Sequence, residues 1–321
     1  MAALDLRVDS VDNCDDEVDN RTAVEDGTKI QKRGSWLKPP WGKKEKTSSV
    51  PRQSYKGATG YTDAKIATIL RDFLQPDTKL SHLDVIATIL PLIPANATAS
   101  AEISSFSEMC VELAEQIPYH HPSQLKFAQL LSRLGKSPKF QSKYPIEGSS
   151  EILYDKYQRL REELADATGL DEDFPYDWVN INSFQAKLYS MGTFGATPGR
   201  SFVQLRYVFE RESQKPEEGR LATLERNNEI MAATQWIIWH GQTMFSFIIY
   251  DDDIKDTHIC PVGDIGDATP FQPRSLERWR YWARKFEKVE TWTEATDECK
   301  GLSARAARLM HVLEENMVFS G

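Results

Sequence analysis

Cysteine is scarce in this sequence, and no two cysteines have the spacing of a metal or redox site. The four thiols lie far apart, at Cys14, Cys110, Cys260 and Cys299. None belongs to a Cys-x-x-Cys pair of the kind that binds zinc or exchanges disulfides. We therefore expect four reduced cysteines and no metal.

Long apolar runs are also missing. Hydrophobic residues make up 40% of the chain and charged residues 27%, and no run reaches the roughly 20 apolar residues that span a bilayer. Acidic residues follow within the first ten positions, whereas a secretory signal begins with a basic region and an apolar stretch. These absences predict a protein without a membrane span that stays inside the cell, in the cytoplasm or the nucleus.

Motifs of phosphate, cofactor and catalytic sites are absent as well. Gly192, Gly195 and Gly199 lack both a preceding strand and the Gly-Lys-Ser/Thr ending of a phosphate loop. No Gly-x-Ser-x-Gly or His-Glu-x-x-His pattern occurs. The sequence therefore predicts no cofactor, and it leaves open whether the protein is an enzyme.

Charge is present but unevenly distributed. Residues 1–26 carry nine acids and two basic residues, whereas residues 27–56 carry nine lysines and arginines and one acid. Both stretches are poor in periodic apolar residues, so burial does not offset the entropy of the chain there. We predict a disordered arm over residues 1–57, acidic in 1–26 and basic in 27–56. Only the basic stretch offers a nucleic-acid signal, because the rest of the chain is acidic.

The basic stretch contains one further feature. Trp36 and Trp41 flank a Pro-Pro step beside a cluster of lysines that ends at Lys46. This segment has the composition of a short docking motif or a nuclear-import signal. The alternative is a solvated linker whose aromatic rings rest loosely on the rest of the protein.

From residue 60 onward, apolar residues recur every three or four positions, which is typical of helices. Pro76, Pro91 and Pro118 follow the first three helical patterns and cannot continue them. The predicted helices lie near residues 60–75, 81–90, 100–117, 122–135, 150–168, 180–191, 199–213, 219–250, 274–289 and 294–317. We predict an all-α fold over residues 58–321, a single domain that forms an irregular bundle of about ten helices without a β-sheet.

One segment is ambiguous. Residues 236–250 are rich in β-branched and aromatic residues, as two buried strands would be. The length of the segment and its continuous polar lead-in, residues 225–229, favour a central helix that is buried on most sides. We predict the helix.

The aromatic residues of this segment supply the candidate site. Trp236 and His240 are four positions apart and share one helix face, with Trp239 beside them. Trp279 and Trp282 form a second aromatic stripe, three positions apart. We take these five residues as a candidate ligand pocket and His240 as the only catalytic candidate, a general acid or base. The alternative is that His240 is a satisfied core residue and that both tryptophan stripes are core.

Two weaker constellations predict no metal. His120 and His121 are adjacent, so they do not face one ligand in a helix or strand, and we expect His121 to cap or pack against the turn before Pro122. Residues 251–253 are consecutive aspartates, which point in different directions instead of pairing at i and i+4 as a magnesium site needs. We expect a solvated acidic turn there.

Three segments resemble a known family. They read QIPYHHPSQ at residues 116–124, WVNINSFQAKL at 178–188 and SLERWRYW at 275–282. In this order and spacing they are similar to the fungal domain-of-unknown-function 3632 family, over roughly residues 60–318. The resemblance implies a helical, intracellular protein of filamentous fungi, sometimes encoded beside secondary-metabolite genes. It brings no catalytic residues.

Two functional hypotheses remain. The first is a non-enzymatic interaction or accessory protein whose N-terminal arm acts as a tether. The second is a cofactor-independent enzyme or a small-molecule carrier, similar to a cyclase or isomerase of secondary metabolism, with an aromatic pocket around Trp236, His240 and Trp282. The partner is accordingly an unknown protein or a small molecule.

Overall fold

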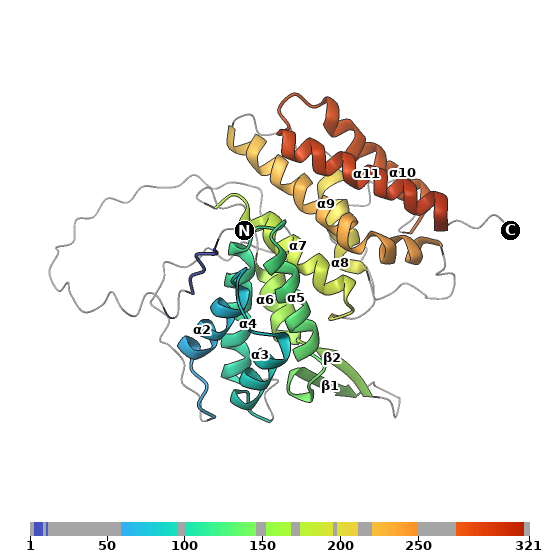
Figure 1. Cartoon of the computed structure of the whole chain (residues 1–321). Helices are drawn as coiled ribbons and strands as arrows, with labels where there is room; N and C mark the ends of the chain where they lie inside the picture. The colour runs from blue at the N-terminus through green and yellow to red at the C-terminus, as the bar shows by residue number, and fades with distance from the viewer. Residues whose placement is uncertain are drawn as a thin grey trace, which may run out of the picture. The chain divides into compact units, whose positions relative to one another are not determined.

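The computed structural model describes the chain in separate stretches. These are residues 3–8, 11, 59–95, 100–145, 152–167, 174–194, 198–210, 220–249 and 274–317. The described residues form ten α-helices and one two-stranded sheet (Figure 1). Their contacts gather into two compact units, which are Met1–Gln116 with Leu134–Gly169, and Ile117–Arg133 with Leu170–Gly321. We refer to them as unit 1 and unit 2.

Unit 1 is built from short helices and a small hairpin. Its elements are α2 (Asp63–Leu74), α3 (His82–Ile89), α4 (Ala101–Gln116), β1 (Gln141–Pro145), β2 (Ile152–Lys156) and α6 (Gln158–Asp166). Thr62 begins α2 by accepting a hydrogen bond from Lys65 N, and Ser81 begins α3 with a reciprocal capping box to Asp84. The predicted start of the second helix at Ser81 is confirmed, whereas the first helix was predicted from residue 60 and begins at Asp63.

The hairpin is the one departure from the predicted fold class. β1 pairs with β2 in antiparallel register, from Gln141 opposite Lys156 to Pro145 opposite Ile152. We predicted no β-sheet and a helix over residues 150–168, and the helix α6 begins only at Gln158. The two strands read QSKYP and ILYDK, and neither alternates apolar with polar residues, so the period-two pattern of a strand is missing. The prediction of an all-α protein of about ten helices is otherwise confirmed for the described residues.

The beginning of the predicted arm also departs from expectation. Leu6 is 7% exposed and Val8 is fully buried, and the backbone of the segment is hydrogen-bonded to side chains of unit 1. The prediction of disorder is therefore wrong for residues 3–8. Partners far along the chain supply the contacts, and local composition does not reveal them. Residues 12–58, with the basic stretch and Trp36, lie outside the described residues, and the prediction there stays a prediction.

Unit 2 is organised around one long helix. Its elements are α5 (Pro122–Leu134, whose last residue groups with unit 1), α7 (Asp177–Ser190), α8 (Gly199–Phe209), α9 (Arg220–Ile249), α10 (Leu276–Lys288) and α11 (Asp297–Met317). Helix α9 packs against α7, α8, α10 and α11 (Figure 1). The prediction that residues 236–250 continue a central helix is confirmed as far as Ile249.

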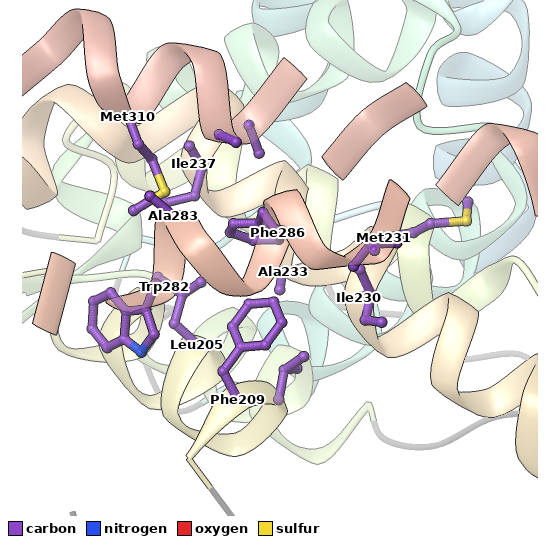
Figure 2. Close-up of a cluster of buried hydrophobic side chains, with 14 of the residues drawn as sticks. Leu205, Phe209, Ile230, Met231, Ala233, Ile237, Trp282, Ala283, Phe286 and Met310 are labelled. Atoms are coloured by element: carbon purple, nitrogen blue, oxygen red, sulfur yellow. The ribbon is translucent and has the colours of Figure 1, made fainter. Parts of the chain in front are cut away.

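The core of unit 2 lies where α8, α9, α10 and α11 meet. Figure 2 shows Trp282, Ala283 and Phe286 of α10 close to Leu205 and Phe209 of α8 and to Ala233 and Ile237 of α9. The rings of Phe209 and Phe286 meet edge to face, with their centroids 4.7 Å apart. Burial of these apolar faces is what holds the four helices together.

Two further predictions concern the number of domains and the absence of a membrane span. The contacts divide residues 58–321 between two units, and the prediction that these residues behave as one cooperative domain stays a prediction. Among the helices in the described stretches, none has the combination of length and apolar character that crossing a membrane requires.

Candidate functional site

Trp236 lies in a polar contact between α9 and α7. Its side chain is fully buried, and its indole N–H donates to Asn182 Oδ1 over 2.9 Å. The amide of Asn182 donates in turn to the carbonyl of Trp178, one turn earlier on α7. Because the only polar group of Trp236 is satisfied inside the chain, this indole offers no free donor to a ligand.

His240 lies one turn further along α9, against the start of α8. Its ring is 2% exposed, and Nδ1 lies 3.3 Å from the hydroxyl oxygen of Ser201. That hydroxyl donates its single proton to the carbonyl of Pro198 over 2.6 Å. The Ser201 oxygen is therefore left to accept from an Nδ1–H. In this arrangement the histidine positions the serine and does not deprotonate it.

Two aromatic rings, those of Tyr189 and Trp236, lie next to the imidazole of His240. The ring of Tyr189, on α7, lies 5.8 Å from the imidazole and 5.5 Å from the ring of Trp236. No carboxylate among the described residues hydrogen-bonds to His240. Burial lowers the pKa of His240 to about 4, because the apolar surroundings disfavour the imidazolium.

This pKa predicts a loss of stability in mild acid. The folded state holds His240 neutral down to pH about 4, while the unfolded chain protonates it near pH 6.5. Stability is therefore complete above pH 6.5 and falls as the pH drops towards 4. Between pH 7 and pH 5 we expect the native protein to lose about 2 kcal/mol more unfolding free energy than His240→Gln. Urea titrations of both proteins at the two pH values measure the difference.

His311 supplies the matched control for that experiment. It pairs with Glu287 at the surface, where its side chain is 47% exposed. The comparison of His240→Gln with His311→Gln then separates the loss of a buried imidazole from the loss of a surface one. Parallel curves for the native protein and His240→Gln would show that the buried imidazole does not stay neutral.

Trp239 faces a lysine on α7. The Nζ atom of Lys187 lies 4.6 Å from the centroid of the indole ring, which is within the range of a cation–π contact. Trp239 is partly buried, whereas Lys187 is only 1% exposed. The candidate residue Trp239 thus covers a charged group that the sequence did not single out.

Lys187 is the centre of a buried cluster of neutral polar groups. Its ammonium donates to the carbonyl of Tyr119 over 3.0 Å, to the Ser183 hydroxyl over 2.8 Å and to the side-chain oxygen of Gln124 on α5. The Gln124 amide continues the cluster by donating to the carbonyl of Asn180. Every acceptor is uncharged, and burial lowers the pKa of Lys187 to about 7.

Sequence reasoning missed Lys187, although one signal was present. It is the only charged residue between Val179 and Leu188, and all ten residues of this stretch are buried. A helix segment that is buried on every side leaves no solvent for a lysine to reach. A single charge inside such a stretch is therefore a candidate for an internal polar contact.

Trp279 and Trp282 belong to a different part of unit 2. The indole of Trp279 donates to the carbonyl of Met310 on α11, and its ring packs against Phe245 with 5.0 Å between centroids. The indole of Trp282 donates to Glu210 over 2.7 Å. The structure therefore brings Trp236 and His240 together with Tyr189, but it places both α10 tryptophans in the core where α8, α9, α10 and α11 meet.

Glu210 is also the acceptor of a buried ion pair. Arg278 on α10 contacts both of its carboxylate oxygens, with Nε 2.7 Å from Oε1. The two side chains are 5% and 1% exposed. A bidentate pair of this kind is the strongest form of the interaction. Sequence patterns do not indicate this pair, because the partners are 68 positions apart.

The weaker constellations form no metal site in the described residues, where no group of three or more histidine, cysteine or acidic side chains is placed to hold an ion. The prediction for His121 is confirmed, because its Nδ1 accepts a hydrogen bond from Ser123 N in the first turn of α5. Residues 251–253 lie outside the described stretches.

The described fold and site thus define a mainly helical protein in which Trp236, Trp279 and Trp282 are buried and their indole N–H groups are bonded within the chain. Residues 108–286 match the model of a family described as a protein of unknown function (DUF3632). The match covers more than half of the chain, so this protein belongs to that family, as the three sequence segments indicated. No curated protein and no solved structure matches the chain.

Proposed function

We propose that this protein is a non-enzymatic interaction or accessory protein that acts inside the cell. The observation that supports the proposal is the internal pairing of the candidate pocket. The indole N–H groups of Trp236, Trp279 and Trp282 are each bonded to an acceptor of the chain, and all three side chains are fully buried. Binding sites for small molecules keep a few polar groups free to orient the ligand.

The chemistry around His240 supports the same proposal. A general base is held by an orienting partner and faces the proton that it removes. His240 instead faces a serine whose proton is already bonded to Pro198. The low pKa of His240 also makes it a weak base near neutral pH.

A second function is favoured by Lys187. A buried amine with a pKa of about 7 is partly neutral at physiological pH, and a neutral amine is a nucleophile towards carbonyl compounds. Its contact with the partly buried Trp239 is the feature that a cofactor-independent enzyme or a small-molecule carrier would use. This alternative is the cyclase-like or isomerase-like role in secondary metabolism.

Native mass spectrometry of protein purified from its own host separates the two functions. For the interaction protein we expect a second polypeptide at a fixed ratio and no retained small molecule. A stoichiometric small molecule that is lost in Lys187→Met would overturn the proposal and establish the carrier.

Lys285 provides the matched control. It also makes a cation–π contact, with its Nζ 5.1 Å from the centroid of the Tyr281 ring, but on the partly exposed side of α10. Lys285→Met should leave any bound species unchanged. Loss of the ligand in both lysine variants would point to general destabilisation and not to a site at Lys187.

A further inference from the structure

The first described residues of the chain are held like a bound peptide. Residues 3–8 run beside α2 and α4 of unit 1 (Figure 1). They form no helix or strand of their own. Two glutamines contact their backbone, Gln75 at the end of α2 and Gln116 at the end of α4.

Each glutamine pairs with both backbone groups of one residue. Leu4 N donates to Gln75 Oε1 over 3.0 Å, and Gln75 Nε2 donates back to the Leu4 carbonyl over 3.0 Å. Arg7 N and the Arg7 carbonyl pair with the amide of Gln116 in the same way, both over 2.8 Å. A side-chain amide thus takes the place that a neighbouring strand would have. These bonds hold the backbone whatever the side chains are.

The side chains of the segment alternate between exposed and buried. Asp5 and Arg7 point to solvent, with side chains 86% and 75% exposed. Leu6 is 7% exposed and Val8 is fully buried. Alternation with a period of two is the pattern of an extended peptide with one face in a groove. In peptide recognition of this type the backbone bonds give affinity and the buried side chains give specificity.

We propose that the α2/α4 end of unit 1 is a peptide-binding groove whose ligand is residues 3–8 of the same chain. The groove recognises this segment through the side chains of Leu6 and Val8. The groove takes an extended segment with apolar side chains two positions apart and does not select for charge. This inference does not depend on the function proposed above, since it concerns unit 1 alone.

The contact of residues 3–8 with unit 1 bears on the predicted role of the N-terminal arm as a tether. At its far end, Thr59 donates a hydrogen bond to the carbonyl of Leu92. The described residues on either side of residues 9–58, Val8 and Thr59, therefore both contact unit 1. In the sequence, the basic stretch 27–56 lies between these two contacts. Release of residues 3–8 would remove the first of them.

The test uses the full-length chain and a synthetic peptide of residues 1–11. The double substitution Leu6→Asp and Val8→Asp in the protein removes the internal ligand and leaves the groove intact. Because the tethered segment no longer competes, we expect the labelled peptide to bind this variant about tenfold or more tighter than the native protein, by fluorescence anisotropy. Equal binding to both proteins, or no binding to the variant, would overturn the proposal.

Two altered peptides test which side chains of the ligand the groove recognises. A peptide with Leu6→Asp and Val8→Asp should lose at least about tenfold in affinity, because a charge would enter each buried position. A peptide with Asp5→Ser and Arg7→Ser should keep its affinity, because both side chains are exposed. The opposite ranking of these peptides would contradict the assignment of Leu6 and Val8.

Hydrogen exchange measures how firmly residues 3–8 are held in the native protein, without any substitution in that segment. The amides of Leu4 and Arg7 should be protected, but less than the amides of the α4 core, because a docked ligand opens locally. In Gln75→Leu the protection of Leu4 should fall while the protection of α4 persists. Protection of Leu4 equal to that of the α4 core would identify the segment as a fixed part of the fold and refute the proposal.

Discussion

Replacing Arg278 by alanine is expected to lower the free energy of unfolding by about 3–5 kcal/mol. Arg278 and Glu210 form a bidentate pair with side chains 5% and 1% exposed. Removal of the arginine leaves the buried Glu210 carboxylate with one hydrogen-bond donor, the indole of Trp282, and with the guanidinium of Arg206, whose Nε lies 4.0 Å from Oε2. A buried carboxylate that loses its hydrogen-bonded counterion is disfavoured, and Arg206 at 4.0 Å is too distant for a hydrogen bond that would replace it, which is why the cost exceeds the value of one hydrogen bond. Urea-induced unfolding followed by circular dichroism measures the loss.

Arg280, two positions along the same helix, is the matched control. It pairs with Glu314, but its side chain is 51% exposed. An exposed ion pair contributes about 0–1 kcal/mol, so Arg280→Ala should lie within that range of the native protein. If Arg278→Ala cost no more than Arg280→Ala, the interior of unit 2 would be open enough for water to solvate Glu210.

The second large effect is an increase of stability with pH that depends on Lys187. Its pKa is about 7 in the folded protein, against about 10.4 in an unfolded chain. Between these values the unfolded chain binds the extra proton, so stability rises with pH through this window. From pH 7 to pH 10 we expect a gain of about 3 kcal/mol relative to Lys187→Met. The measurement is the urea midpoint of each protein at pH 7, 8, 9 and 10.

The comparison with Lys187→Met isolates this one group. Other lysines and tyrosines titrate in the same range, but they are common to both proteins and cancel in the difference. Lys285→Met, which removes a lysine from a partly exposed position, should track the native protein at every pH. A constant difference between the native protein and Lys187→Met would mean that Lys187 keeps its charge when buried.

The helices could be predicted because their signals are local. Capping residues such as Ser81 act on the first turn of the helix that follows. Pro122 opens α5 at the position where its missing N–H costs nothing. The bounds of α9, Arg220–Ile249, fall within one residue of the predicted 219–250. Each of these features depends on residues within a turn or two of one another.

The candidate site could be predicted only in part. The sequence indicates which side chains share a helix face, but not which residues of other helices they contact. Trp236 and His240 share a face of α9 and meet the same ring, that of Tyr189. Trp279 and Trp282 have the same helical spacing, yet they belong to another contact of unit 2. Spacing along one helix shows which side chains face the same way, but not which helix covers them.

The amino-acid sequence by itself determined where most of the helices lie, that residues 236–249 continue a buried central helix, and which family the chain belongs to. Only the tertiary structure decided that residues 3–8 dock on two glutamines, that Lys187 is buried among neutral acceptors, and that Glu210 pairs with Arg278. The physical reason is distance along the chain. Helix propensity and capping act within a few positions, whereas Leu4 and Gln75 are 71 positions apart and Arg7 and Gln116 are 109. Such contacts exist only once packing has brought distant segments together.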